Sequence, residues 1–257
     1  MLSMNRRSLP ANIFRLRLLL FLLVVFIVLV EGGVNALSAM MSAKPRILAL
    51  HGKTQTAESF SKKIGGARRK LAREFDLTFL DGPIDLEEVA VPPPATGASG
   101  KAWFLREPLE GKPGEFRYLK LAEAMKYVTD YASMNGPFDG LMGFSQGGTL
   151  AAALAASGAI PVRAVITAGA PHIEEAFVAA SEWTATSGDA KERDVGLTIP
   201  KLHLAGETDA IISVESTDEL CLMAGSGEMI IHEKGHMFPT KAVYVDQMVE
   251  FLQTSLK

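Results

Sequence analysis

Short apolar runs alternate with longer amphipathic stretches from Arg46 to the end of the chain. Apolar runs bounded by glycine, proline or polar residues are typical of strands that are buried on both faces of a parallel sheet. They predict strands at residues 46–50, 77–80, 140–143, 164–167, 201–205 and 229–232. The stretches between them predict helices at residues 57–74, 118–134, 147–156, 216–224 and 241–254. The alternation therefore predicts an α/β fold, with a mainly parallel, twisted sheet of about six strands flanked by helices.

Two segments interrupt this alternation. Consecutive prolines at residues 92–94 predict a surface loop over residues 91–100, because proline has no N–H to donate within a helix or a central strand. Residues 173–198 are rich in small and polar side chains. They predict either a helical excursion that forms a lid over the carboxyl edge of the sheet or a plain surface insertion.

The first 43 residues differ in kind from the rest of the chain. An apolar run from Leu18 to Val30 follows several arginines, and no acidic residue precedes Glu31. This pattern is typical of a signal peptide, and the run is shorter than the roughly 20 residues that span a bilayer comfortably. We interpret residues 1–43 as a signal peptide or membrane anchor, and residues 44–257 as a single globular domain.

The N-terminal segment leaves several destinations open. Small residues at 34–36 offer a cleavage site that would send the domain into the endomembrane system or out of the cell. Without cleavage, residues 18–30 would contact or anchor in a membrane. A start at Met40 or Met41 would instead give a cytoplasmic protein, and a plastid or mitochondrial address is the remaining alternative.

The composition fits one domain and excludes several classes of function. Of 257 residues, 48% are hydrophobic and 21% are charged, which suits an undivided α/β domain. The formal net charge of −3 argues against a nucleic-acid partner, because neutralising phosphates requires clustered lysine and arginine. Cys221 is the only cysteine, which excludes an intrachain disulfide and a cysteine-rich metal site. The chemistry must therefore come from other side chains.

A G-x-S-x-G motif at residues 143–147 joins a predicted strand to a predicted helix. In this context the serine sits on a tight, strained turn, and the flanking glycines let neighbouring backbones approach it. The helix N-terminus then points at the serine, where backbone N–H groups stabilise negative charge that develops in a transition state. The motif predicts Ser145 as a nucleophile. The alternative is a glycine-rich turn with an incidental serine.

A serine hydroxyl needs a base, and five histidines compete for that role, at positions 51, 172, 203, 232 and 236. His203 and His232 lie in predicted strands, where a buried histidine with satisfied hydrogen bonds is the usual explanation. His236 lies in a loop between the last strand and the last helix, which is the position of the base in an α/β-hydrolase. We predict His236 as the general base, with His172 as the alternative.

The carboxylate that orients the base should lie between the serine and the histidine in sequence, since this fold has that order. Asp209 satisfies the order and follows the predicted strand 201–205. Its carboxylate would accept the second N–H of the imidazole and stabilise the imidazolium. Glu207, which is nearer the strand end, and Asp218, at the start of the next helix, are the alternatives.

The oxyanion hole is predicted from position alone. The first strand ends in Leu50-His51-Gly52-Lys53, and the loop after this strand supplies one oxyanion donor in the fold. We predict the backbone N–H groups of Lys53 and Gln146 as the two donors. His51 would shape the turn and not act as the base.

Several motifs together resemble the FSH family of serine hydrolases. The resemblance runs from Pro45 to the C-terminus. Its more specific pieces are residues 102–104, 136–140, 143–148, 199–203 and 206–209. It implies an α/β-hydrolase fold and hydrolysis of carboxylic esters, in some members long-chain alkyl esters, with no metal and no organic cofactor. It also implies that Ser145, Asp209 and His236 form the triad, although Ala210 replaces the family's usual acidic residue or proline.

The sequence thus predicts a serine hydrolase that acts on a small-molecule ester with an apolar acyl or alkyl chain. A lining of Trp103, Phe104, Phe177 and Met237 would suit an apolar acyl chain, although residues of these types are more often core. An enzyme related to acyl-protein or lysophospholipid thioesterases is one alternative, because fold and triad would be shared. A non-catalytic α/β-hydrolase scaffold that binds a ligand or partner is the other.

A reporter fusion tests the interpretation of the N-terminal segment. We expect residues 1–45 to direct a fluorescent protein to a membrane compartment or the secretory route, because a basic region followed by an apolar run is read as a signal. Microscopy of the fusion, beside a matched fusion that begins at Met41, measures this. A diffuse cytosolic signal from both fusions would contradict the signal or anchor interpretation.

Overall fold

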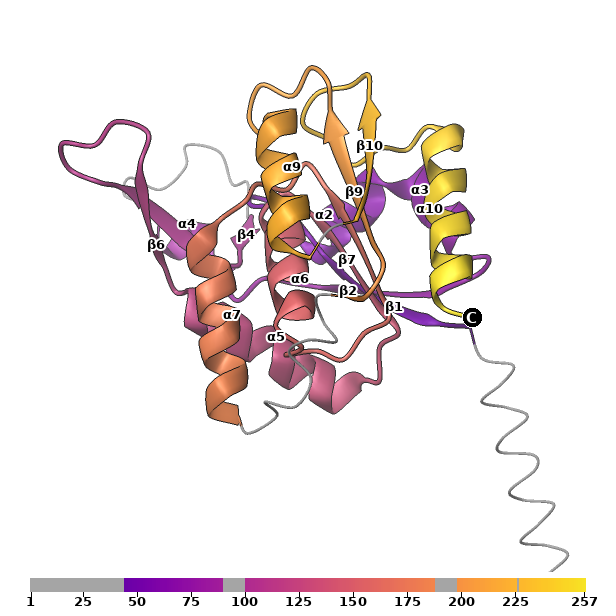
Figure 1. Ribbon diagram of the computed structural model, residues 1–257, viewed down its shortest axis with the longest axis horizontal. Helices are drawn as coiled ribbons and strands as arrows, with labels where there is room; N and C mark the ends of the chain where they lie inside the picture. Colours follow the sequence, from indigo (N-terminus) through magenta and orange to yellow (C-terminus); the bar gives the residue numbers. More distant parts are fainter. Residues whose placement is uncertain (1–43, 90–99, 188–197, 226) are drawn as a thin grey trace, which may run out of the picture. The chain divides into compact units, whose positions relative to one another are not determined.

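The computed structural model describes residues 44–89, 100–187, 198–225 and 227–257 (Figure 1). Among these residues, six strands form one sheet in the order β10-β9-β8-β7-β1-β2, and every neighbouring pair is parallel. The strands are β1 (Arg46–Leu50), β2 (Asp76–Leu80), β7 (Gly140–Phe144), β8 (Ala164–Ala168), β9 (Lys201–Gly206) and β10 (Glu228–His232). The predicted strands and the parallel α/β architecture are confirmed, with differences of one residue at the strand ends.

Helices cover both faces of this sheet. They are α2 (Ala57–Lys63), α3 (Gly65–Leu71), α5 (Leu121–Asn135), α6 (Gln146–Ala156), α7 (Glu174–Ser187), α9 (Val214–Met223) and α10 (Ala242–Ser255). Alternate residues of β1 point to opposite faces: Ile47 packs with α2, α3 and α10, whereas Leu48 packs with α5, α6 and α7. Figure 1 shows α10 and α3 together on one side of the sheet, and α5, α6 and α7 on the other.

Two predicted helices differ from the structure by more than two residues at an end or are interrupted. The helix predicted at residues 57–74 is interrupted at Ile64, which ends α2 and precedes α3. Two successive glycines follow this residue, and glycine is a poor helix former, so the chain bends there. The helix predicted to begin at residue 118 begins at Leu121 instead, because Tyr118 pairs in a strand and Lys120 has a left-handed φ of 65°.

The segment between β2 and α5 contains small elements that the apolar pattern did not predict. Strand β3 (Ile84–Asp85) leads into the short helix α4 (Leu86–Val89) and pairs with β4 (Lys101–Ala102). Strands β5 (Leu105–Pro108) and β6 (Phe116–Leu119) form an antiparallel hairpin that projects from the body of the domain (Figure 1).

Several sequence predictions fall wholly or partly outside the described residues. The N-terminal segment 1–43 and the loop at residues 90–99 are among them. Residues 188–197 of the predicted excursion also lie outside, whereas its first part forms α7, which packs against α5 and α6. No described helix combines the length and the apolar character needed to cross a bilayer.

A histidine buried within the sheet makes the stability of the fold depend on pH. His203 on β9 is fully buried, and its Nδ1 lies 2.8 Å from Oγ1 of Thr167, its neighbour on β8. Burial, together with the nearby charge of Lys201, lowers the pKa of His203 from 6.5 to about 4. The ring is therefore neutral in the folded protein at neutral pH.

We expect His203→Gln to reduce the dependence of stability on pH. Below pH 6.5 an unfolded histidine binds a proton that the folded protein excludes until about pH 4, so the stability contribution of His203 is lost as pH falls through this window. The loss amounts to about 3 kcal/mol in wild type. Urea unfolding at pH 7.5 and pH 4.5 measures it. Equal pH dependence in wild type and variant would contradict the assignment.

Candidate active site

The turn between β7 and α6 holds Ser145 in an unusual backbone conformation. Its φ of 50° and ψ of −123° lie outside the regions that non-glycine residues ordinarily adopt. The turn is tight because α6 passes close to the end of β1: a Cβ added at Gly147 would lie 2.5 Å from the carbonyl oxygen of Leu50. The glycines and the close packing thus make the chain turn sharply at Ser145. The serine lies at the amino end of a buried helix.

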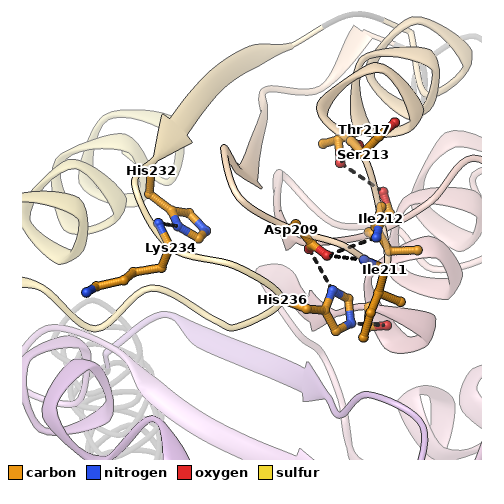
Figure 2. Close-up of polar contacts among 10 residues, drawn as sticks. Asp209, Ile211, Ile212, Ser213, Thr217, His232, Lys234 and His236 are labelled. Carbon is orange, nitrogen blue, oxygen red and sulfur yellow. Dashed lines mark hydrogen bonds and ion pairs between the residues drawn. The ribbon is translucent and has the colours of Figure 1, made fainter.

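The loops after β9 and β10 bring an aspartate and a histidine to this serine. Nε2 of His236 lies 3.0 Å from Oγ of Ser145, and Nδ1 of His236 lies 2.7 Å from Oδ2 of Asp209. Figure 2 shows the imidazole of His236 directed at the carboxylate of Asp209. The three predicted residues, which are separated by up to 91 positions in the chain, therefore form one hydrogen-bonded series.

The carboxylate of Asp209 is fixed from both sides. The backbone N–H groups of Ile211 and Ile212 donate to its Oδ1 at 2.8 and 2.9 Å, which leaves Oδ2 for the imidazole (Figure 2). Its side chain is only 1% exposed. An ionised carboxylate can only accept, so His236 donates from Nδ1 and its Nε2 is the acceptor that faces the serine hydroxyl.

The competing carboxylates lie elsewhere. The backbone N–H of Glu207 donates to the carbonyl of His232, and the Glu207 residue is exposed. Asp218 is exposed on α9. Among the described residues, Asp209 is the acidic residue that hydrogen-bonds to His236.

The other histidines have partners of their own. His51 accepts the N–H of Gly82 at Nε2 and donates from Nδ1 to the Gly52 carbonyl, and burial lowers its pKa. His172 lies beside two glutamates, with its Nε2 3.4 Å from the nearer one, Glu174. His232 is buried, which lowers its pKa, and it accepts the N–H of Lys234 (Figure 2).

A second layer of hydrogen bonds shapes the predicted oxyanion hole. The Gly52 N–H donates to Oε1 of Gln55, so the turn after β1 is tied down just before Lys53. Gln146 turns its side chain into the core, where its Oε1 accepts the Trp103 N–H at 2.9 Å and its Nε2 donates to the Phe104 carbonyl. The sequence did not single out Gln55, although its polar side chain three residues after Gly52 was the available signal.

A cavity of about 280 Å³ adjoins the imidazole. Its lining is mainly apolar, and consists of Gln55, Phe60, Lys63, Ile64, Phe144, His236, Met237 and Phe238. Of the residues suggested for an apolar lining, Trp103 and Phe104 do not line this cavity and are buried in the core on the other face of the sheet. Phe177 also packs against that core, and only Met237 lines the cavity.

The described part of the chain contains no cluster of metal-binding side chains. No group of three or more histidine, cysteine, aspartate or glutamate side chains there could hold an ion.

A parallel sheet with a strand-serine-helix turn, and with loops after later strands that supply a histidine and an aspartate, defines the α/β-hydrolase fold. Comparison with known families agrees. The family model described as serine hydrolase (FSH1) matches residues 41–248, and the chain belongs to this family.

Individual proteins extend the comparison. The chain is 29% identical over 222 residues to esterase OVCA2 of Xenopus tropicalis, which covers 80% of this chain and 93% of that protein. It is 29% identical to an uncharacterised hydrolase of Schizosaccharomyces pombe over 82% of this chain, and spans about half (51%) of that relative. The crystal structure of Arabidopsis thaliana SOBER1 has a TM-score of 0.55 at 18% identity, and the match covers 84% of this chain and 100% of that one, which shows a shared fold.

We expect Gly169→Ala to weaken the enzyme by displacing the imidazole. Gly169 follows β8 with a φ of 53°, and a Cβ there would lie 3.2 Å from Nδ1 of His236. Displacing a reacting group by a fraction of an ångström lowers kcat/KM by about tenfold or more. Hydrolysis of p-nitrophenyl acetate measures the effect.

Gly111→Ala is the matched control for this variant. Gly111 has a similarly left-handed φ of 74°, but nothing lies within 4 Å of an added Cβ. Gly111→Ala therefore places an alanine at a left-handed φ without crowding the imidazole. An equal loss of activity in both variants would show that strain alone, and not the approach to His236, explains the effect.

Proposed function

We propose that this serine hydrolase cleaves carboxylic esters, with Ser145 as the nucleophile, His236 as general base and acid, and Asp209 as the residue that orients the imidazole. The observation that carries the proposal is the pair of hydrogen bonds of 3.0 and 2.7 Å that joins the three side chains. The similarity to proteins named esterase supports the same substrate class.

The first half of the reaction forms an acyl-enzyme. Oγ of Ser145 attacks the ester carbonyl carbon while Nε2 of His236 takes the hydroxyl proton. The tetrahedral intermediate then expels the alcohol, and the imidazolium gives its proton to the departing alcohol oxygen. One C–O bond forms, one breaks, and the proton passes from serine to alcohol.

The second half returns the enzyme to its starting state. A water molecule takes the place of the alcohol beside His236, which removes a proton from it as it attacks the acyl carbon. The bond to Oγ breaks, the serine regains its proton from the imidazolium, and the carboxylic acid leaves. Two steps with one base require nothing beyond protein and water.

Negative charge on the carbonyl oxygen is stabilised by the backbone N–H groups of Lys53 and Gln146. The Gln146 group is at the first turn of α6, where the helix dipole favours an anion. The Lys53 group follows a turn that the Gln55 and Trp103 side chains tie down, because Nε1 of Trp103 donates to the His51 carbonyl at 2.7 Å. Fixed donors of this kind require no rearrangement as the charge develops.

We expect a fluorophosphonate probe to label wild type, to leave Ser145→Ala unlabelled, and to label His236→Ala only slowly. The probe reports an activated serine, which needs both the hydroxyl and the base.

Asp209→Asn should lower kcat by about 10⁴-fold, because an amide favours the wrong imidazole tautomer. Gel fluorescence and the hydrolysis of p-nitrophenyl esters measure these effects.

His172→Ala is the control for the choice of base, and should be labelled like wild type. Labelled Ser145→Ala, or a loss of labelling in His172→Ala as large as in His236→Ala, would contradict the site assignment. Matched oxygen esters and thioesters test the substrate class, and a clear preference for thioesters would overturn ester hydrolysis as the function.

A further inference from the structure

We propose that the cavity beside His236 holds the leaving alcohol of the ester, and not the acyl chain, so that the enzyme selects esters of apolar alcohols. The inference rests on the proposed ester hydrolysis and deepens it, because it assigns one half of the substrate to one set of side chains.

The position of the cavity separates it from the groups that hold the acyl carbon. Residues of the histidine loop form one wall, α2 forms another, and Phe144 lies between them. Neither Ser145 nor the predicted oxyanion donors, Lys53 and Gln146, are among the described residues that line it. The cavity therefore adjoins the proton-transfer group more closely than the groups that bind the carbonyl.

The order of proton transfers decides which half of the ester lies on this side. Nε2 of His236 must give a proton to the leaving oxygen, so that oxygen must come within about 3 Å of Nε2. The acyl carbon is meanwhile bonded to Ser145, with its oxygen directed to backbone donors. A substituent that extends past the imidazole into the cavity is therefore attached to the leaving oxygen.

The lining selects an uncharged, apolar group. Three phenylalanines, Ile64 and Met237 supply most of the walls. Gln55 is buried, and its Oε1 already accepts the Gly52 N–H. Lys63 is exposed and is the one lysine among the described lining residues. Its ammonium group disfavours an alcohol that carries a positive charge.

Aromatic contacts hold the walls in place. The Phe60 ring stacks on Phe144 with 6.2 Å between centroids and meets Phe238 edge-on at 5.8 Å. Phe144 in turn lies 4.9 Å from the imidazole of His236. All three phenylalanines are less than a tenth exposed, so the cavity is preformed and not a gap between mobile surface groups.

The size of the cavity decides which alcohols gain from it. A water molecule takes about 30 Å³ in the liquid and a methylene group is of similar size, so a cavity of about 280 Å³ accommodates several such groups. Burial of each methylene contributes about 0.8 kcal/mol, which corresponds to a fourfold rise in kcat/KM. Acetate esters from methyl to dodecyl should show this rise and then level off once the alcohol is longer than the cavity.

Tryptophan substitutions on α2 provide the critical comparison. Lys63→Trp should fill the cavity and lower the ratio of kcat/KM for octyl acetate to that for methyl acetate at least tenfold. Lys62→Trp is the matched control, because Lys62 is the exposed neighbour that pairs with Glu58, does not line the cavity, and loses the same charge. It should keep the wild-type ratio. As a second variant, Met237→Ala enlarges the cavity and should move the point at which the rise levels off to longer alcohols.

Deacylation distinguishes a leaving-group cavity from an acyl cavity. The alcohol departs in the first step, so hydrolysis of an acetyl-enzyme or decanoyl-enzyme formed in wild type and in Lys63→Trp should proceed at the same rate. Rapid-mixing burst kinetics measure this rate. If Lys63→Trp slows decanoyl-enzyme hydrolysis or flattens the series of methyl esters with growing acyl chains, the cavity holds the acyl chain and the inference is wrong.

Two failures of wild type are also distinguishable. Hydrolysis of methyl acetate and fluorophosphonate labelling without any dependence on alcohol length would overturn the leaving-group assignment alone. Absence of both ester hydrolysis and labelling would overturn the proposed function, and this inference with it.

Discussion

The close passage of α6 beneath the end of β1 is the constraint on which the site depends. Because only glycine fits at position 147, the chain turns sharply at Ser145 and enters the helix without an intervening loop. The strain at Ser145 is offset by the burial of the whole helix, all of whose residues are buried. The same turn that exposes the hydroxyl also directs the helix N-terminus at the carbonyl that the serine would attack.

The order of the strands brings the other residues of the site to the strained turn. β1 lies between β2 and β7, so the chain reverses its direction of winding at the crevice between β1 and β7. Parallel strands all end at one edge, and ligands of open α/β sheets bind where the winding reverses. The turn after β1, which contains Lys53, and Ser145 after β7 are therefore neighbours. The later strands β9 and β10 add the aspartate and the histidine at the same edge.

The sequence predicted the sheet and the position of the three polar residues, because both depend on local signals in a fixed chain order. Apolar runs mark buried strands, and Ser145, Asp209 and His236 each follow one. The cavity could not be predicted in this way: Phe60 and Phe238 are far apart in sequence, and nothing local distinguishes them from Trp103 or Phe104, which are core. The β5–β6 hairpin was missed because its strands mix charged and apolar residues, with no clear alternation.

The complete enclosure of α6 has a consequence for motion. A helix that begins at the nucleophile and packs against β1, β7, β8 and α7 has no solvent-facing side on which to fray or tilt. Opening it would disrupt the core on that face of the sheet, so the free energy of such an opening approaches that of unfolding the domain. Ser145 is thus mounted on a rigid part of the domain, and adjustment to different substrates falls to the loops around it.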